Sequence, residues 1–60
     1  MNDKELIDIR DQLRTVFLGC DEIATKLQGS DIEDAHKIIT AQNLVYELLD
    51  TVQKEIESRG

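Results

Sequence analysis

Few side chains in this sequence are of the types that carry out catalysis. The 60 residues include one histidine, His36, and one cysteine, Cys20. No serine or cysteine nucleophile stands beside His36 at local helical spacing, and on a helical wheel His36 falls about 160° from the apolar stripe. We therefore interpret it as an exposed histidine near the start of a helix. Cys20 falls at a core position of a heptad pattern, where a thiol behaves as a small hydrophobic group.

Metal binding and acid–base chemistry are not indicated either. One thiol and one imidazole are too few ligands for a four-coordinate structural zinc. Thirteen carboxylates offer many pairs, but acid–base catalysis needs them in a sequestered pocket with shifted pKa values. The sequence has no glycine-rich phosphate loop and no HExxH or CxxC motif. We expect no enzymatic activity, no cofactor and no metal ion.

The composition predicts a helical, acidic, soluble protein. There is no proline, 40% of the residues are hydrophobic, and the formal net charge is −6. Seven basic residues are spread along the chain, which argues against general affinity for nucleic acid or an anionic membrane, because phosphate neutralisation needs clustered cations. The N-terminal segment Met1–Glu5 is polar overall and has no apolar core of signal-peptide length. No apolar run approaches the roughly 20 residues that span a bilayer. The expected location is the cytoplasm.

Capping signals divide the chain into two helices. Gly29 suits the position after a helix end, where positive φ is common. Ser30 followed three residues later by Glu33 is typical of a capping box at a helix start, and Asn2 with Glu5 is a weaker version of the same motif. The stop and start signals abut, so the link between the helices is short.

These signals predict a single domain covering residues 1–60: an all-α, antiparallel two-helix hairpin. Its helices span about 3–28 and 31–57, with a turn at 29–30. A link this short makes the helices antiparallel neighbours. Gly19 costs roughly 1 kcal/mol inside a helix, and we expect it to permit close helix contact or a slight bend. A helix break at Gly19 is the alternative.

Apolar residues follow a heptad stripe along both predicted helices, as in a coiled coil. In the first helix the stripe consists of Leu6, Ile9, Leu13, Val16, Cys20, Ile23 and Leu27. In the second it consists of Ala35, Ile38, Gln42, Val45, Leu49, Val52 and Ile56, with apolar flanks formed by Ile32, Ile39 and Tyr46 on one side and by Ala41, Leu44 and Leu48 on the other.

The apolar arc of the second helix is wider than one neighbouring helix covers. We therefore predict a homodimer in which two hairpins form a four-helix bundle. The pattern leaves the relative direction of the two hairpins open. The predicted dimer core consists of Leu13, Val16, Cys20, Ile23, Ile38, Gln42, Val45, Leu49 and Val52.

Gln42 is the polar member of that core. A polar residue at one core layer often determines register and oligomeric state. The alternative is that Gln42 lies near the edge of the bundle and extends to water.

The outer surfaces carry acid-to-base pairs at i, i+4, which mark solvated faces and contribute a few tenths of a kcal/mol each. They are Glu22–Lys26, Glu33–Lys37, Asp50–Lys54 and Glu55–Arg59. Ile7, Arg14 and Leu18 lie off the stripe of the first helix, and we interpret them as a possible face for a protein partner. The alternative is that Ile7 and Leu18 are scattered exposed apolar residues with no binding role, which are normal on protein surfaces.

These features favour a small non-catalytic interaction protein that acts as a homodimer and binds another protein through an exposed helix face. Small bacterial or phage regulators are built in this way, which is an analogy of fold. An acidic mimic of nucleic acid is one alternative, but the mixed pairing of charges counts against a continuous acidic band.

RNA binding is the other alternative. The chain length, the tight turn and the heptad of the first helix resemble those of the Rop-type plasmid RNA-binding hairpins, which dimerise into four-helix bundles. That resemblance implies an RNA contact on the outer face of the first helix, made by an exposed aromatic and polar residues. Here Phe17 borders the core and Thr15 takes the outward position, which leaves Lys4 and Lys26 as phosphate contacts.

Overall fold

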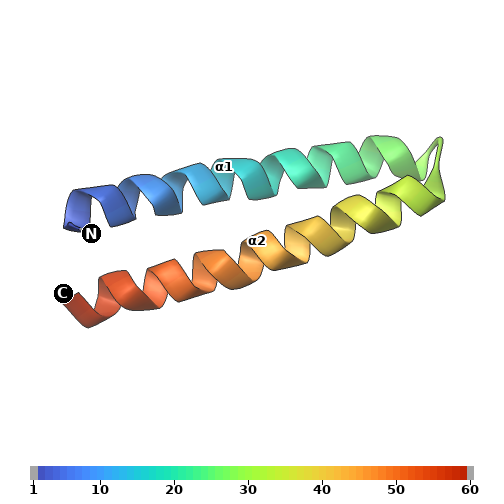
Figure 1. The fold of residues 1–60 in the computed structure, drawn as a ribbon. Helices are drawn as coiled ribbons and strands as arrows, with labels where there is room; N and C mark the ends of the chain where they lie inside the picture. The colour runs from blue at the N-terminus through green and yellow to red at the C-terminus, as the bar shows by residue number, and fades with distance from the viewer. Residues whose placement is uncertain (1, 60) are drawn as a thin grey trace.

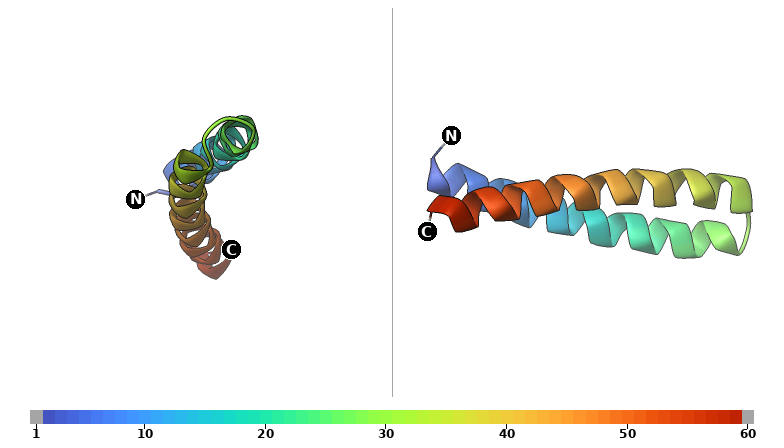
Figure 2. Two further views of the ribbon diagram at one scale, coloured as in Figure 1. Left: turned by 90° about the vertical axis from the view of Figure 1, so that its right-hand side faces the viewer. Right: turned by 90° about the horizontal axis from the view of Figure 1, so that it is seen from below.

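Two antiparallel α-helices joined by a short turn make up the fold (Figure 1). The structure, a computed structural model, describes residues 2–59. Helix α1 spans Asp3–Gln28 and helix α2 spans Ile32–Arg59. The start of α1 and the end of α2 lie at one end of the hairpin and the turn lies at the other (Figure 1 and Figure 2), and the principal extents are 44 × 14 × 14 Å. The predicted all-α hairpin is confirmed, and the predicted range 31–57 lies within two residues of α2 at each end.

The start of α1 is capped as the Asn2–Glu5 pattern predicts. The Asn2 side-chain oxygen accepts a hydrogen bond from the Glu5 amide at 2.9 Å. The Glu5 carboxylate accepts one at 3.4 Å from the side-chain amide of Asn2, not from its backbone N–H. The cap satisfies one of the amides that a helix N-terminus leaves without an intrahelical partner.

The turn closes without the left-handed glycine that was predicted. Gly29 has φ −83° and ψ −12°, so it stays in the right-handed helical region. The amides of Ser30 and Asp31 both donate to the Leu27 carbonyl, at 3.0 and 2.6 Å. The chain therefore turns tightly at the end of α1, and the Leu27 carbonyl, which has no partner further along the helix, accepts both of these hydrogen bonds.

The cap of α2 is Asp31, one residue later than predicted. The Asp31 carboxylate accepts a hydrogen bond from the Asp34 amide at 3.2 Å, and its carbonyl accepts the first helical bond from Ala35 at 3.0 Å. The predicted Ser30–Glu33 box is wrong, because the Ser30 hydroxyl donates back to the Lys26 carbonyl at 3.4 Å. A carboxylate also interacts more favourably than a hydroxyl with the positive end of the helix dipole.

The two adjacent residues allow a direct test of this cap. Asp31→Ala is expected to lower the free energy of unfolding by about 1 kcal/mol, the usual effect of losing an N-cap. Ser30→Ala is the matched control, with an expected change below about 0.5 kcal/mol. Urea unfolding followed by circular dichroism measures both. A larger loss in Ser30→Ala than in Asp31→Ala would restore the original assignment.

Helix α1 passes through Gly19 without a break. A Cβ atom built at Gly19 meets nothing within 4 Å. Within the hairpin, Gly19 therefore serves no close approach of α2, contrary to the expected helix contact there.

The interior of the hairpin is a single line of side chains between two helices. The buried residues are Leu6, Cys20, Ala24, Ala35 and Val52. Three of these five are small, so α1 and α2 bury little apolar area against each other. All other apolar side chains within residues 2–59 are half-buried or exposed.

Two of the four predicted surface ion pairs form in the hairpin. Lys54 meets Asp50 at 3.0 Å and Arg59 meets Glu55 at 3.1 Å. Lys37 pairs with Asp34 at 3.6 Å instead of Glu33, because the i, i+3 neighbour is also within reach on a helix. Lys26 has no ion pair among residues 2–59, so the predicted Glu22 pair is absent.

Candidate interaction surface

Gln42 makes a hydrogen bond between the two helices. Its side-chain amide donates to the Phe17 carbonyl at 3.2 Å, and the contact is partly buried. Gln42 thus lies in the contact between α1 and α2, which we call the seam, and its hydrogen bond helps to fix the position of α2 along α1.

Gln42→Ala is expected to lower the free energy of unfolding by about 1 kcal/mol, because one interhelical hydrogen bond and its methylene packing are lost. The loss stays modest because the Phe17 carbonyl lies inside α1, where an i+4 amide is its regular helical donor. Thermal or urea unfolding at a single protein concentration measures the change. An unchanged midpoint would mean that the hydrogen bond contributes nothing.

An aromatic pair marks one side of the seam. The rings of Phe17 on α1 and Tyr46 on α2 lie 5.9 Å apart at 49°, a tilted geometry that aromatic pairs favour. Successive residues of a helix are about 100° apart around its axis. The angle of any residue around its helix axis, measured from Phe17 on α1 or from Tyr46 on α2, therefore shows on which side of the hairpin that residue lies.

The opposite side carries exposed apolar side chains from both helices. On α1, Val16 and Ile23 lie about 100° and 120° round the axis from Phe17, across the seam. On α2, Leu44 and Leu48 lie about 160° from Tyr46 in either direction. Their exposed fractions are 49% for Val16, 47% for Ile23, 62% for Leu44 and 51% for Leu48.

We call this surface the apolar face. It consists of Ile9, Val16 and Ile23 of α1 and Ala41, Leu44 and Leu48 of α2. Ile9 is half-buried, and Ala41 is exposed. Gly19 lies on the same stripe of α1, between Val16 and Ile23 at spacings of 3 and 4.

The predicted dimer core divides between the seam and the apolar face. Cys20 and Val52 are buried between α1 and α2. Leu13, Ile38, Gln42, Val45 and Leu49 are half-buried along the same seam. Val16 and Ile23 stand exposed on the apolar face. Ala41, Leu44 and Leu48, which the sequence marked only as a flank of the second helix, lie beside them.

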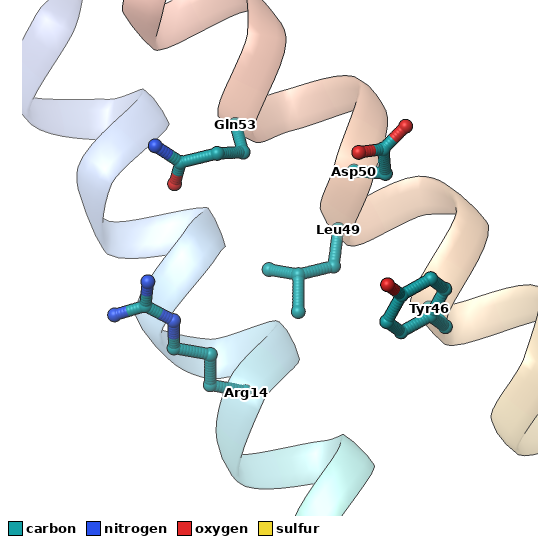
Figure 3. A pocket seen from close by; sticks show the side chains of 5 residues that line it. All are labelled: Arg14, Tyr46, Leu49, Asp50 and Gln53. Atoms are coloured by element: carbon teal, nitrogen blue, oxygen red, sulfur yellow. The ribbon is translucent and has the colours of Figure 1, made fainter.

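Two of the three residues proposed for a protein partner line hollows between α1 and α2. Arg14 lines one hollow of about 190 Å³, together with Tyr46, Leu49, Asp50 and Gln53 (Figure 3). Ile7 lines the other, with Asp3, Ile56 and Arg59. Leu18 is 64% exposed and lines neither. The structure thus joins Arg14 and Ile7 to residues of α2, which helical spacing in one helix does not reveal.

The Arg14 hollow combines unpaired and paired polar groups. Arg14 makes no ion pair among residues 2–59, while Asp50 is paired with Lys54 at 3.0 Å. That hydrogen bond raises the pKa of Lys54. The Gln53 amide donates to Glu57 at 3.3 Å, and its side-chain oxygen is buried without a partner in the described part of the chain.

Arg59 ties the open end of the hairpin together. Its guanidinium contacts Glu55 at 3.1 Å and Asp3 of α1 at 3.3 Å. The hydrogen bonds to these two carboxylates, with Glu55 the larger influence, raise the pKa of Arg59. The contact with Asp3 holds the last turn of α2 beside the first turn of α1.

His36 is exposed at the start of α2 and Cys20 is a buried free thiol. Within residues 2–59, no three His, Cys, Asp or Glu side chains are placed to hold a metal ion. Neither described helix combines the length and apolar character that crossing a membrane requires. Comparisons of the chain with protein-family models, curated proteins and solved structures give no match.

Proposed function

We propose that this chain is a non-catalytic interaction protein that acts as a homodimer. Two hairpins pack through their apolar faces into a four-helix bundle. The sides that carry the Phe17–Tyr46 pair then point outward, where they are available to a protein partner.

The exposure of the apolar face carries the proposal. Val16, Ile23, Leu44 and Leu48 each leave about half or more of their surface in water in a single hairpin. Fully burying a side chain of this type contributes about 1.5–3 kcal/mol. A 60-residue chain is marginal with its own core alone, so a second copy on this face supplies the burial that one hairpin lacks.

The size of the face also suits a stable dimer. A side of the hairpin measuring 44 by 14 Å spans roughly 600 Å² in projection. Side-chain relief makes the accessible area larger, close to the roughly 800 Å² per partner that specific interfaces bury. A crystal-type contact is usually smaller and more poorly packed.

Size-exclusion chromatography with light scattering tests the dimer. The expected mass is twice the 6.8 kDa of one chain across micromolar to millimolar concentrations. A cooperatively folded monomer at millimolar concentration would refute the proposal.

The partner side is tested by capture experiments with the dimer. Leu18→Glu places a charge one helical turn from Arg14 on the exposed side of α1 and is expected to abolish binding of any stoichiometric partner while the dimer persists. Thr40→Glu, at an exposed position on the back of α2 and outside the apolar face, is the matched control and should leave binding intact. Equal capture by both variants would remove this side as the binding surface.

A further inference from the structure

Two stripes of residues on the apolar face have nearly palindromic order with opposite charges at their ends. On α1 the stripe has spacings of 3 and 4 throughout and consists of Glu5, Ile9, Gln12, Val16, Gly19, Ile23 and Lys26. On α2 the corresponding stripe consists of Lys37, Ala41, Leu44, Leu48, Thr51 and Glu55. Each stripe therefore has an acidic end near the termini and a basic end near the turn.

The centres of the two stripes lie at the same level of the hairpin. The α1 stripe is centred on Val16, and the α2 stripe is centred midway between Leu44 and Leu48, at Tyr46. The Phe17–Tyr46 ring contact at 5.9 Å places these two centres beside each other. A single two-fold axis across the hairpin can therefore pass through both.

We propose that the second copy lies antiparallel to the first, with its turn over the termini of the first hairpin. This inference rests on the proposed dimer. The two-fold axis is perpendicular to the helices. It packs α1 on α1 of the second copy and α2 on α2 of the second copy, and the paired helices run in opposite directions. The two turns then lie at opposite ends of the bundle.

This arrangement matches the α1 stripe with itself position by position. Val16 meets Val16 of the second copy, and Ile23 meets its Ile9. Gln12 lies opposite Gly19, where the missing side chain leaves room: a Cβ at Gly19 has no neighbour within 4 Å in the single hairpin. The pairing gives the mid-helix glycine a role that the hairpin alone does not.

The α2 stripe is matched in the same way. Leu44 meets Leu48 of the second copy at the centre, and Ala41 meets Thr51. The most exposed apolar residues of the face therefore bury one another.

The charges at the ends complete the match. Lys26, which has no ion pair among residues 2–59, lies opposite Glu5 of the second copy. Lys37 lies opposite Glu55, although these two also have partners within their own chain, Asp34 at 3.6 Å and Arg59 at 3.1 Å. Four cross-copy contacts between unlike charges result from the two-fold symmetry.

The parallel arrangement, with both turns at one end, brings like charges together. In this arrangement the two-fold axis runs parallel to the helices, so α1 of one copy packs on α2 of the other. Residues at the same height along the hairpin then face each other. The contact between Asp3 and Arg59 at the open end shows which residues of α1 and α2 share a height. Glu5 would then lie near Glu55, and Lys26 near Lys37. Repulsion between like charges makes this arrangement less favourable.

Charge reversal distinguishes the two arrangements by the sign of the effect. In the antiparallel dimer, Lys26→Glu faces Glu5 and is expected to raise the dimer Kd about three- to thirty-fold, because two symmetric contacts change from attraction to repulsion. The double variant Lys26→Glu with Glu5→Lys should restore most of the affinity. Lys54→Glu, away from the apolar face, has the same change in net charge and is the control. A lower Kd for Lys26→Glu than for Lys54→Glu would overturn the antiparallel arrangement.

A distance measurement provides a second, independent readout. A spin label at Ser30→Cys, in a Cys20→Ala background shown to be dimeric, is about 14 residues from the axis. At 1.5 Å per residue, the two labels are then roughly 40 Å apart. In the parallel arrangement both labelled turns lie at the same end of the bundle, where neighbouring helices are about 10 Å apart. A short distance refutes the inference but leaves the dimer in place, whereas a monomeric wild-type chain refutes the proposed function itself.

Discussion

Replacing Leu48 with glutamate is expected to raise the dissociation constant of the dimer by about 10²- to 10⁴-fold. Leu48 is 51% exposed in the single hairpin and lies at the centre of the apolar face. Burial of a leucine contributes about 1.5–3 kcal/mol, and the symmetric dimer contains two copies. Because Leu48 is only half exposed in one hairpin, dimerisation gains roughly half of this per copy, so the two copies together lose about 1.5–3 kcal/mol, or about 10- to 100-fold at 1.4 kcal/mol per factor of ten. Burying two carboxylates without partners costs at least about 1 kcal/mol each and accounts for the rest of the stated range.

Sedimentation or light scattering over a concentration series measures this change. Leu18→Glu is the control, since Leu18 has a similar exposure of 64% but lies on the outer side of α1. The control is expected to stay dimeric. If both variants dimerise like the wild type, the apolar face is not the interface. If both become monomeric, general charge repulsion explains the result better than this surface does.

The second large effect concerns the seam inside one hairpin. Leu6→Ala is expected to lower the free energy of unfolding by about 2–4 kcal/mol, because Leu6 is only 6% exposed and a truncated core leucine leaves a cavity. A chain of 60 residues has a total stability of only about 3–9 kcal/mol. One buried leucine therefore accounts for a large share, and the melting temperature should fall by more than about 10 °C.

Leu18→Ala is the matched control for Leu6→Ala, with an expected change below about 0.5 kcal/mol. Both variants must be compared at one protein concentration, since association of folded chains adds to the apparent stability. Equal losses in the two variants would mean that burial in the hairpin does not determine stability at these positions.

The secondary structure of this protein follows from local sequence. Heptad spacing of apolar residues, the absence of proline, and the polar residues around Gly29 predict two long helices with a short link, and the structure has them at Asp3–Gln28 and Ile32–Arg59. These features act within a few residues of one another. Local hydrogen bonding and helix propensity are therefore enough to predict them.

The details of the turn were not predictable from the motif alone. Ser30–Glu33 and Asp31–Asp34 both fit an N-cap at neighbouring positions, and only the path of the chain out of α1 selects between them. The amides of Ser30 and Asp31 both bond to Leu27, and the Asp31 carboxylate caps the Asp34 amide. The choice depends on a backbone geometry that no single residue determines.

The sequence by itself determined that α2 has more apolar surface than one neighbouring helix covers, because hydrophobic periodicity is a property of one helix. Only the tertiary structure decided which side is left open. Contacts of Gln42 and Tyr46 with Phe17 set the rotation of α2 against α1. That rotation buries Cys20 and Val52 in the seam and leaves Val16, Ile23, Leu44 and Leu48 in water. The physical reason is that a heptad pattern specifies an apolar arc, whereas the packing of two helices selects the part of each arc that they share.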